Sequence, residues 1–176
     1  MNGGELRLLI GAGEIRARVA EMGRQITADY AEGPLRLIAI LKGACFFLCD
    51  LARAIDRDVS IDFMGISSYG RDTSSSGEVR VTKDLDHEIA GLDVLIVEDI
   101  VDTGITLDYL HRILEQRGPR SLRIAALLDK PSRRRKPVRL AYTGFQIPDQ
   151  FVVGYGLDYG ERYRNLADIC VLGGQP

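Results

Sequence analysis

Apolar and polar positions alternate along the chain with two different periods. Over residues 14–32 the apolar positions lie three or four residues apart, which predicts an amphipathic helix that ends at Gly33-Pro34. The same spacing predicts helices over residues 44–55 and 105–117. Each of these helices has one apolar face suited to packing against a sheet.

Shorter segments have the composition of β-strands. Most are continuous apolar runs, typical of strands buried on both faces, whereas one alternates apolar and polar residues. The predicted strands are 35–41, 59–66, 79–81, 93–98, 122–128 and 151–155. The polar, Gly-rich segment 67–77 is predicted to be a mobile loop, 131–137 a basic loop, and the residues after 155 irregular with one short turn.

The order of these elements predicts an α/β fold. Buried strands that alternate with amphipathic helices favour a mostly parallel sheet covered on both faces, and residues 1–176 form one domain without repeat or linker. In such sheets, ligands bind beyond the carboxyl ends of the strands. The segments where chemistry is expected are therefore 41–44, 66–77, 98–106, 128–134 and 154–160.

Composition and charge exclude several classes of protein. Of the 176 residues, 45% are hydrophobic and 27% are charged, which excludes a disordered chain, a collagen-like repeat and a disulfide scaffold. The net charge of −2 gives no general attraction to nucleic acid or to an anionic membrane. We therefore expect neither as a partner.

The cysteines indicate a reducing compartment. Cys45, Cys49 and Cys170 have the spacing of neither a zinc site nor a disulfide framework. Cys45 and Cys49 are expected to be small core residues on one helix face. Since no secretory leader and no apolar run of membrane-spanning length is present, the expected location is the cytoplasm.

Two weaker features favour structural interpretations. Gly11-Ala12-Gly13 resembles the start of a dinucleotide-binding fingerprint, but Arg16 stands where the third glycine is needed, so a turn before a helix is preferred. His87 and His111 have no Cys or Ser partner and are expected on the surface.

The strongest chemical signal is the segment 94–106. A buried strand delivers two adjacent carboxylates, Glu98 and Asp99, and a turn follows with Asp102, two threonines and a glycine before the next helix. The turn amides and the helix N-terminus can hold a phosphate, the paired carboxylates can accept hydrogen bonds from a cis-diol, and Asp102 can take a proton. A capped helix with solvated acids would explain one acid but not three.

This segment resembles the phosphoribosyl pyrophosphate motif of the type I phosphoribosyltransferases. Leu41-Lys42-Gly43 resembles their pyrophosphate loop and Ser68-Tyr69-Gly70 the start of their flexible lid. Lys130 and residues 151–159, followed by Arg164, resemble their purine pocket and hood. The resemblance runs from about residue 10 to 172 and is most specific for the hypoxanthine(-guanine) phosphoribosyltransferases in their bacterial form.

The resemblance implies a fold and a set of site residues. The fold is a mainly parallel, five-stranded core sheet flanked by helices, with a small hood built from both chain ends. Asp102 is the implied catalytic residue, and Glu98, Asp99 and Asp158 are the implied ligands of Mg²⁺. The implied substrate-binding residues are Leu41, Lys42, Gly43, Ser68, Tyr69, Glu98, Asp99, Asp102, Thr103, Gly104, Ile105, Thr106, Lys130, Phe151, Val152, Asp158 and Arg164.

Three of these residues are implied to contact the purine. The Lys130 ammonium suits a 6-oxo acceptor and disfavours the 6-amino group of adenine. Phe151 can stack on the base, and Val152 can offer main-chain contacts to its edge. Without the resemblance, we would expect Lys130 to be a surface lysine and Phe151 to be a core residue.

The implied reaction is purine salvage. A 5-phosphoribosyl group passes from phosphoribosyl pyrophosphate to N9 of hypoxanthine or guanine, which gives IMP or GMP and pyrophosphate, with Mg²⁺ on the leaving group. The implied assembly is a homodimer or homotetramer. A regulator of the same fold that binds nucleotide or RNA, and an enzyme that prefers xanthine or guanine, remain open.

Three further positions bear on these alternatives. The basic run 133–136 is either a solvated loop or, by resemblance, a source of help from Arg133 or Arg134 near a partner's pyrophosphate loop. Ile105 stands where some members of the family have Lys, and Asp129 matches the bacterial form. These departures leave the choice between hypoxanthine and guanine open.

Overall fold

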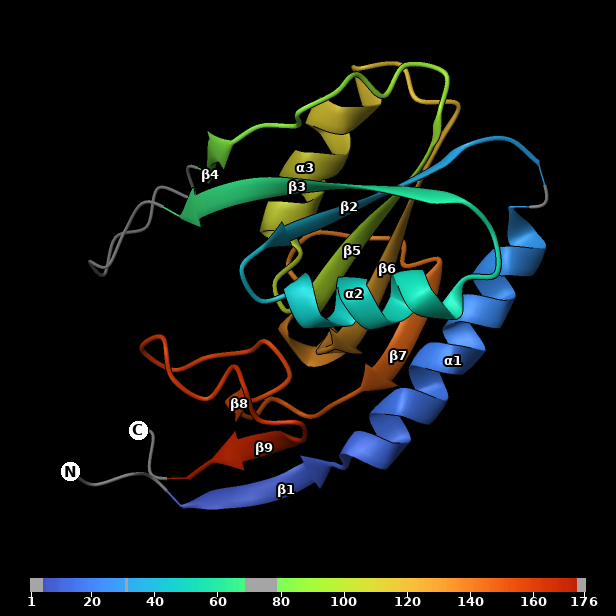
Figure 1. Cartoon of the computed structure of the whole chain (residues 1–176). Helices are drawn as coiled ribbons and strands as arrows, with labels where there is room; N and C mark the ends of the chain where they lie inside the picture. Colours follow the sequence, from blue (N-terminus) through green and yellow to red (C-terminus); the bar gives the residue numbers. More distant parts are fainter. Residues whose placement is uncertain (1–4, 31, 69–78, 174–176) are drawn as a thin grey trace.

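The larger of two sheets carries the parallel strands. The computed structural model describes residues 5–30, 32–68 and 79–173, and its six-stranded sheet has the order β4-β3-β2-β5-β6-β7 (Figure 1). Its strands are β2 (Leu35–Leu41), β3 (Val59–Ser68), β4 (Val79–Lys83), β5 (Asp93–Val101), β6 (Ser121–Asp129) and β7 (Tyr142–Gln146). Only β4 runs antiparallel to its neighbour, so the other strands end at one edge.

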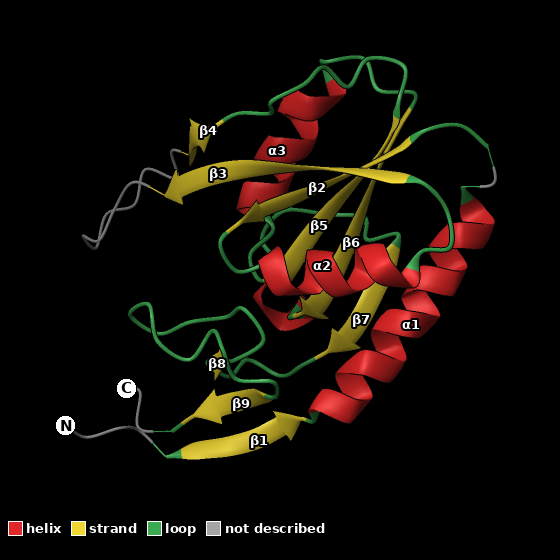
Figure 2. Ribbon diagram, in the orientation of Figure 1, coloured by secondary structure: helices red, strands yellow, loops and turns green. Residues whose placement is uncertain are grey.

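Helices cover both faces of this sheet, as Figure 2 shows. The helices α1 (Ala12–Asp29) and α2 (Cys45–Ala54) pack on one face, and α3 (Ile105–Glu115) packs on the other. A short 3₁₀ turn, η1 (Pro131–Arg133), follows β6. The predicted α/β class, with helices on both faces, is confirmed.

The predicted spacing of α1 reflects its packing. Ile15, Val19, Met22 and Ile26 are all at most 3% exposed, because they share the face that meets the sheet. A Cβ at Gly23 would lie 2.4 Å from the Ala54 carbonyl oxygen, so the glycine lets α1 and α2 approach closely.

The first turn of α1 explains the glycine pair near the N-terminus. The Gly11 amide donates to the Glu14 carboxylate (2.9 Å), and the Ala12 amide donates to Asp168 (2.7 Å). These bonds satisfy amides at the start of the helix that have no partner within it. Gly11 is therefore the N-cap of α1 and Ala12-Gly13 belong to its first turn, so the segment has the structural role expected of it, but the helix begins earlier than predicted.

The smaller sheet joins the two ends of the chain. It contains β1 (Leu6–Ile10), β9 (Ile169–Leu172) and β8 (Val152–Val153), which are antiparallel in the order β1-β9-β8. We call residues 5–10 and 151–173 the hood. The hood is built from both chain ends, as the resemblance implied, and it lies beyond the carboxyl ends of β5, β6 and β7 (Figure 1).

Three strand predictions need correction. The core sheet has six strands, not five, because the half-buried edge strand β7 mixes polar and apolar residues and has no continuous apolar run. The strand predicted over 151–155 shrinks to β8 and belongs to the hood. Residues 169–172, expected to be irregular, form β9, whose pairing with β1 joins distant parts of the chain.

The expectation for the cysteines of α2 is also wrong. Cys49 is exposed and Cys45 only half-buried, because the larger side chains of Phe47, Leu48 and Leu51 occupy the core face of this helix. His87 and His111 lie on the surface as expected. No helix within the described residues is both long and apolar enough to cross a lipid bilayer.

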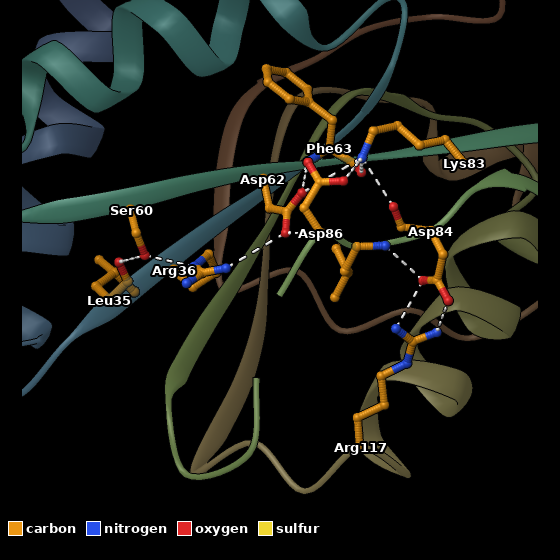
Figure 3. A network of polar contacts seen from close by, with 10 residues as sticks. Leu35, Arg36, Ser60, Asp62, Phe63, Lys83, Asp84, Asp86 and Arg117 are labelled. Atoms are coloured by element: carbon orange, nitrogen blue, oxygen red, sulfur yellow. Dashed lines mark hydrogen bonds and ion pairs between the residues drawn. The ribbon is translucent and has the colours of Figure 1, made fainter. Parts of the chain in front are cut away.

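A polar network connects β2, β3 and β4 at one edge of the sheet (Figure 3). Asp62 of β3 is 3% exposed and accepts hydrogen bonds from the amides of Phe63 (2.7 Å) and Asp86 (3.0 Å). Its carboxylate also lies 3.5 Å from Arg36 of β2 and 3.8 Å from Lys83 of β4. A buried charge requires such pairing, and here the pairing ties three strands together.

Candidate active site

One cleft lies between the sheet edge and the hood. Its volume is about 410 Å³, and its core side comes from the ends of β2, β5 and β6. Its lining residues are Leu41, Lys42, Gly43, Asp99, Ile100, Asp102, Lys130, Phe151, Val152, Leu157, Asp158 and Arg164. All of these except Ile100 and Leu157 were predicted from the sequence.

A second, smaller cavity adjoins the cleft. It has a volume of about 130 Å³ and shares Ile100 and Asp102 with the cleft. Its lining residues are Glu98, Ile100, Val101, Asp102, Thr103, Gly104, Thr106 and Leu107. Glu98 and Asp99 line different cavities, because consecutive side chains of a strand point to opposite faces.

The turn after β5 forms the smaller cavity. Gly104 has φ +80°, and a Cβ there would lie 2.7 Å from the Lys136 carbonyl oxygen, so the position requires glycine. The Thr103 carbonyl accepts the amides of Arg135 (2.9 Å) and Lys136 (3.0 Å), which fasten the basic loop to the turn. Since α3 begins directly after Gly104, its N-terminus adds positive potential.

Burial sets the electrostatics of the paired carboxylates. Burial, followed by the charge of Asp99, raises the pKa of Glu98 well above its usual range. Burial also raises the pKa of Asp99, while its hydrogen bond from the Ile100 amide (2.7 Å) opposes this rise. The pair can therefore hold a proton between them, and a hydroxyl group or cation would relieve the repulsion.

The loop after β2 lies directly on this pair. A Cβ on Gly43 would lie 1.6 Å from Asp99 Oδ2, so any other residue would force the Asp99 carboxylate to move. The Leu41–Lys42 peptide bond is cis. The Lys42 ammonium forms an ion pair with Glu161 of the hood (3.0 Å), in which both side chains are largely exposed. This contact spans the mouth of the cleft.

Charged side chains form a chain on the far side of the cleft. Arg133 Nε lies 3.0 Å from Asp102 Oδ1, and Arg133 Nη1 lies 3.4 Å from Asp149 Oδ2. Lys130 Nζ lies 3.9 Å from Asp149 Oδ1. Lys130 is 7% exposed, so it is not the surface lysine that its position alone suggested. Its amide donates to the Val101 carbonyl (2.9 Å), which joins β6 to β5.

The hood contributes an aromatic ring and a second ion pair. The Phe151 side chain is 42% exposed in the cleft and meets Tyr159 edge to face, with ring centroids 5.7 Å apart. Asp158 Oδ1 lies 2.8 Å from Arg164 Nη2, and Arg164 Nη1 donates to the Gly156 carbonyl (2.7 Å). Arg164 is thereby held in a fixed orientation at the cleft.

Some predicted residues lie elsewhere. Tyr69 and most of the predicted mobile loop lie outside the described residues, as does the side chain of Ser68. Ile105 lines neither cavity, although its amide faces Thr103 Oγ1 at 3.4 Å.

Four residues of this region were not among the predicted site residues. Ile100 and Leu157 line the cleft, and Glu161 and Asp149 pair with its lysines. Ile100 follows the predicted Asp99, and Leu157 precedes the predicted Asp158. Their position next to these residues in the sequence could have identified them. Asp149 and Glu161 had no such signal.

The carboxylates of the cleft fit a cation that a substrate brings with it. Within the described residues, no three His, Cys, Asp or Glu side chains form a cluster that could hold a metal alone. Magnesium is usually held by one or two carboxylates together with substrate phosphates. Asp99 and Asp158 both line the cleft, and no described residue hydrogen-bonds to the buried Glu98 Oε2. Hard oxygen donors are therefore present for such an ion.

Comparisons with known proteins agree with this geometry. A family model described as a phosphoribosyl transferase domain matches residues 11–160. The hypoxanthine-guanine phosphoribosyltransferase of Mycobacterium bovis is 55% identical over 94% of this chain and 85% of its own length. The hypoxanthine phosphoribosyltransferase of Escherichia coli K12 is 49% identical over 92% of each chain.

A solved structure shares the whole fold. The crystal structure of a hypoxanthine phosphoribosyltransferase from Staphylococcus aureus superimposes with a TM-score of 0.92 at 47% identity, over 97% of this chain and 92% of that one. Family model, sequence relatives and structure therefore coincide, and the chain belongs to the phosphoribosyltransferase family, among the hypoxanthine-guanine phosphoribosyltransferases.

Proposed function

We propose that this protein transfers a 5-phosphoribosyl group from phosphoribosyl pyrophosphate to N9 of hypoxanthine or guanine. One observation carries the proposal above the others. The cleft and the adjoining smaller cavity bring together a turn that can hold phosphate, a carboxylate pair and the buried ammonium of Lys130. These groups match the three parts of the reaction, namely the ribose phosphate, the diol and the 6-oxopurine.

Each cavity has one part of the substrate to bind. The turn 102–106 binds the 5′-phosphate in the smaller cavity, through its amides and threonine hydroxyls. Glu98 and Asp99 hold the ribose hydroxyls, one from each side. Lys42 and Arg164 bind the pyrophosphate, because both are cations at the mouth of the cleft.

The purine lies between the hood and β6. Phe151 stacks on the ring, the Val152 main chain meets its edge, and Lys130 donates to the 6-oxo group. Asp102 accepts or returns the proton at N7 as the glycosidic bond forms. The nearby carboxylates stabilise positive charge that develops on the ribose ring.

A divalent cation completes the leaving-group site. Of the three implied ligands, Asp99 and Asp158 line the cleft and would hold Mg²⁺ together with the substrate's phosphates, whereas Glu98 lines the smaller cavity. The ion would supply charge neutralisation for the departing pyrophosphate. Among this chain's own residues, Gly43 brings the backbone of the Leu41–Gly43 loop onto Asp99 and so places Lys42 beside the same group.

The alternative of an RNA-binding regulator has less support. Arg133 and Arg134 of the basic run form ion pairs with Asp102 and Asp129 and are not free for a phosphate backbone. An enzyme that prefers xanthine or guanine differs only in the base, and the assay below ranks the bases directly.

The proposal includes the cellular location and the oligomeric state that the family resemblance implies. The free thiols of Cys45, Cys49 and Cys170 agree with a reducing compartment such as the cytoplasm. The family resemblance is the basis for proposing a homodimer or homotetramer. Light scattering after gel filtration measures the number of copies.

An absorbance assay tests the proposed activity. The protein is mixed with phosphoribosyl pyrophosphate, MgCl₂ and each of hypoxanthine, guanine, xanthine and adenine, and nucleotide formation is followed in the ultraviolet. We expect product from hypoxanthine or guanine and little from adenine. A protein that converts none of the 6-oxopurines, although it is folded and binds phosphoribosyl pyrophosphate, would contradict the proposal.

A further inference from the structure

Asp149 connects two groups that the proposed reaction uses separately. One of its carboxylate oxygens faces Lys130 Nζ at 3.9 Å, and the other faces Arg133 Nη1 at 3.4 Å. The same guanidinium holds Asp102 through Nε at 3.0 Å. The chain Lys130–Asp149–Arg133–Asp102 thus joins the group that recognises the purine to the group that handles its proton.

The position of Arg133 raises a difficulty for the reaction. Its guanidinium covers Asp102 Oδ1, one of the two oxygens that can accept a proton. It also brings positive charge to the place where the ribose ring becomes positive in the transition state, which is unfavourable. Arg133 needs another carboxylate if it is to leave Asp102 while the purine is bound.

Asp149 is suited to this role. Among the described residues, its carboxylate contacts only Lys130 and Arg133, and it is half-exposed, so it can follow a moving guanidinium. A purine whose 6-oxo group accepts from Lys130 takes up part of that ammonium's hydrogen bonding, so the Asp149 carboxylate, which already lies 3.4 Å from Arg133 Nη1, can pair more fully with this guanidinium. Asp149 also lies two residues before Phe151, so one short segment carries both groups.

We propose that Asp149 is a positioning residue, which orients Lys130 toward the purine and holds Arg133 away from Asp102 during the reaction. This inference rests on the proposed function. It adds a residue that touches neither substrate nor reacting atoms and acts through two that do. It also assigns Arg133 a movement between two carboxylates.

The test uses Asp149→Asn, which keeps the shape of the side chain and removes its charge. We expect kcat with hypoxanthine to fall about tenfold and KM for hypoxanthine to rise, while KM for phosphoribosyl pyrophosphate changes little. Asp149→Glu restores the carboxylate and should recover part of the loss. Glu21→Gln, which breaks a similarly exposed ion pair of α1 with Arg18, is the matched control and should behave as wild type.

The decisive variant removes Arg133 in the mutant background. In Asp149→Asn the guanidinium has only Asp102 as a partner, so adding Arg133→Ala should raise kcat again, and Arg133→Ala alone is the reference for the cycle. A purely structural role for Asp149 would give no such rescue. A double variant no faster than Asp149→Asn, or an Asp149→Asn enzyme with wild-type kcat and KM, would overturn the inference.

The wild-type assay separates this inference from the proposed function. A wild-type protein that converts no 6-oxopurine overturns both. An active wild type whose kcat is insensitive to Asp149 overturns only the role of Asp149. Thermal unfolding of each variant beside Glu21→Gln shows whether a loss of rate reflects a loss of fold.

Discussion

At the scale of single residues, four acids of one strand and its following turn differ in ion pairing and burial, because each has different neighbours. Asp93 at the start of β5 pairs with Arg120, and Asp102 in the turn pairs with Arg133. No cation among the described residues forms an ion pair with Glu98 or Asp99, which lie between these two aspartates in the sequence, and burial raises the pKa of both. The repulsion between Glu98 and Asp99 is not balanced by a cation of the protein, so a ligand that donates hydrogen bonds or carries positive charge would be stabilised here. The two carboxylates line the two cavities.

Asp102→Asn tests the proton acceptor. The amide keeps the size of the side chain and can still accept from Arg133 less strongly, but it cannot take up a proton from N7. We expect kcat to fall by about 10²–10⁴, typical for the loss of one acid–base group. Affinity for phosphoribosyl pyrophosphate, measured by calorimetry, should change little. Turnover close to wild type would contradict the role of Asp102.

Lys130 variants test the choice of base. With adenine the buried ammonium meets a 6-amino group that cannot accept its hydrogen bond and keeps only the 3.9 Å contact with Asp149, so adenine should react at least about 10³-fold less efficiently than hypoxanthine. Lys130→Ala should lower kcat/KM for hypoxanthine and shrink this gap. Lys130→Gln should partly restore the gap or reverse it, since an amide both donates and accepts. An unchanged ratio of kcat/KM in the three proteins would mean that Lys130 does not recognise the base.

At the scale of elements, β5 contributes residues both to the hydrophobic core and to the candidate active site. Its first half is buried between β2 and β6, and its second half reaches the two cavities. The start of the strand is held by Asp93, whose carboxylate accepts from Arg120 Nε (3.1 Å) and Ser121 Oγ (2.6 Å). These bonds join β5 to the first residue of β6, at the edge opposite the cleft.

The Asp93 contacts predict a dependence of stability on acid. Hydrogen bonds from Arg120, with help from Ser121, lower the pKa of Asp93 in the folded protein. A lowered pKa means that its stabilisation is complete above the unfolded pKa of about 3.9 and is lost as pH falls through the folded value. Asp93→Asn should therefore lower the free energy of unfolding by about 1–3 kcal/mol at pH 7 and by less at pH 3.

Urea unfolding of wild type and Asp93→Asn at both pH values measures this difference. Glu21→Gln serves again as the control, because its ion pair lies on the surface of α1. Equal differences between wild type and Asp93→Asn at pH 7 and pH 3 would show that the carboxylate charge does not contribute.

At the scale of the whole molecule, the proposed substrate site lies between two parts of the structure, the core and the hood, each of which has its own sheet. In the proposed function, the core supplies the groups that bind the phosphate, hold the ribose diol and handle the proton, and the hood supplies Phe151, Asp158 and Arg164. A ligand in the cleft contacts both parts and should stabilise the molecule as a unit, since it binds only the folded state.

Phosphoribosyl pyrophosphate with MgCl₂ should raise the Tm of the protein. At about 100 times Kd a ligand adds about 2.7 kcal/mol, and for a chain of this size each kcal/mol raises Tm by about 2–4 °C. Addition of EDTA should remove most of this shift, because the carboxylates of the cleft then face the pyrophosphate without a cation. An equal shift with and without EDTA in a thermal melt would contradict the metal site.

The linear sequence by itself determined the periodic helices, the buried strands and the segment 94–106, because these depend on neighbours three, four or two positions away. It determined less about β7 and β9, whose composition is mixed and whose partners are distant along the chain. Cys49 was placed in the core because spacing defines a helix face but not which face is buried.

The tertiary structure alone decided which charges meet. The proximity of Gly43 to Asp99, of Lys42 to Glu161, and of Asp149 to both Lys130 and Arg133 arises from packing the hood and the basic loop against the sheet edge. Such contacts have no periodicity in the sequence, because Coulomb attraction and steric fit depend on distance in space. Local patterns therefore predicted the groups of the site, and the fold decided how those groups are coupled.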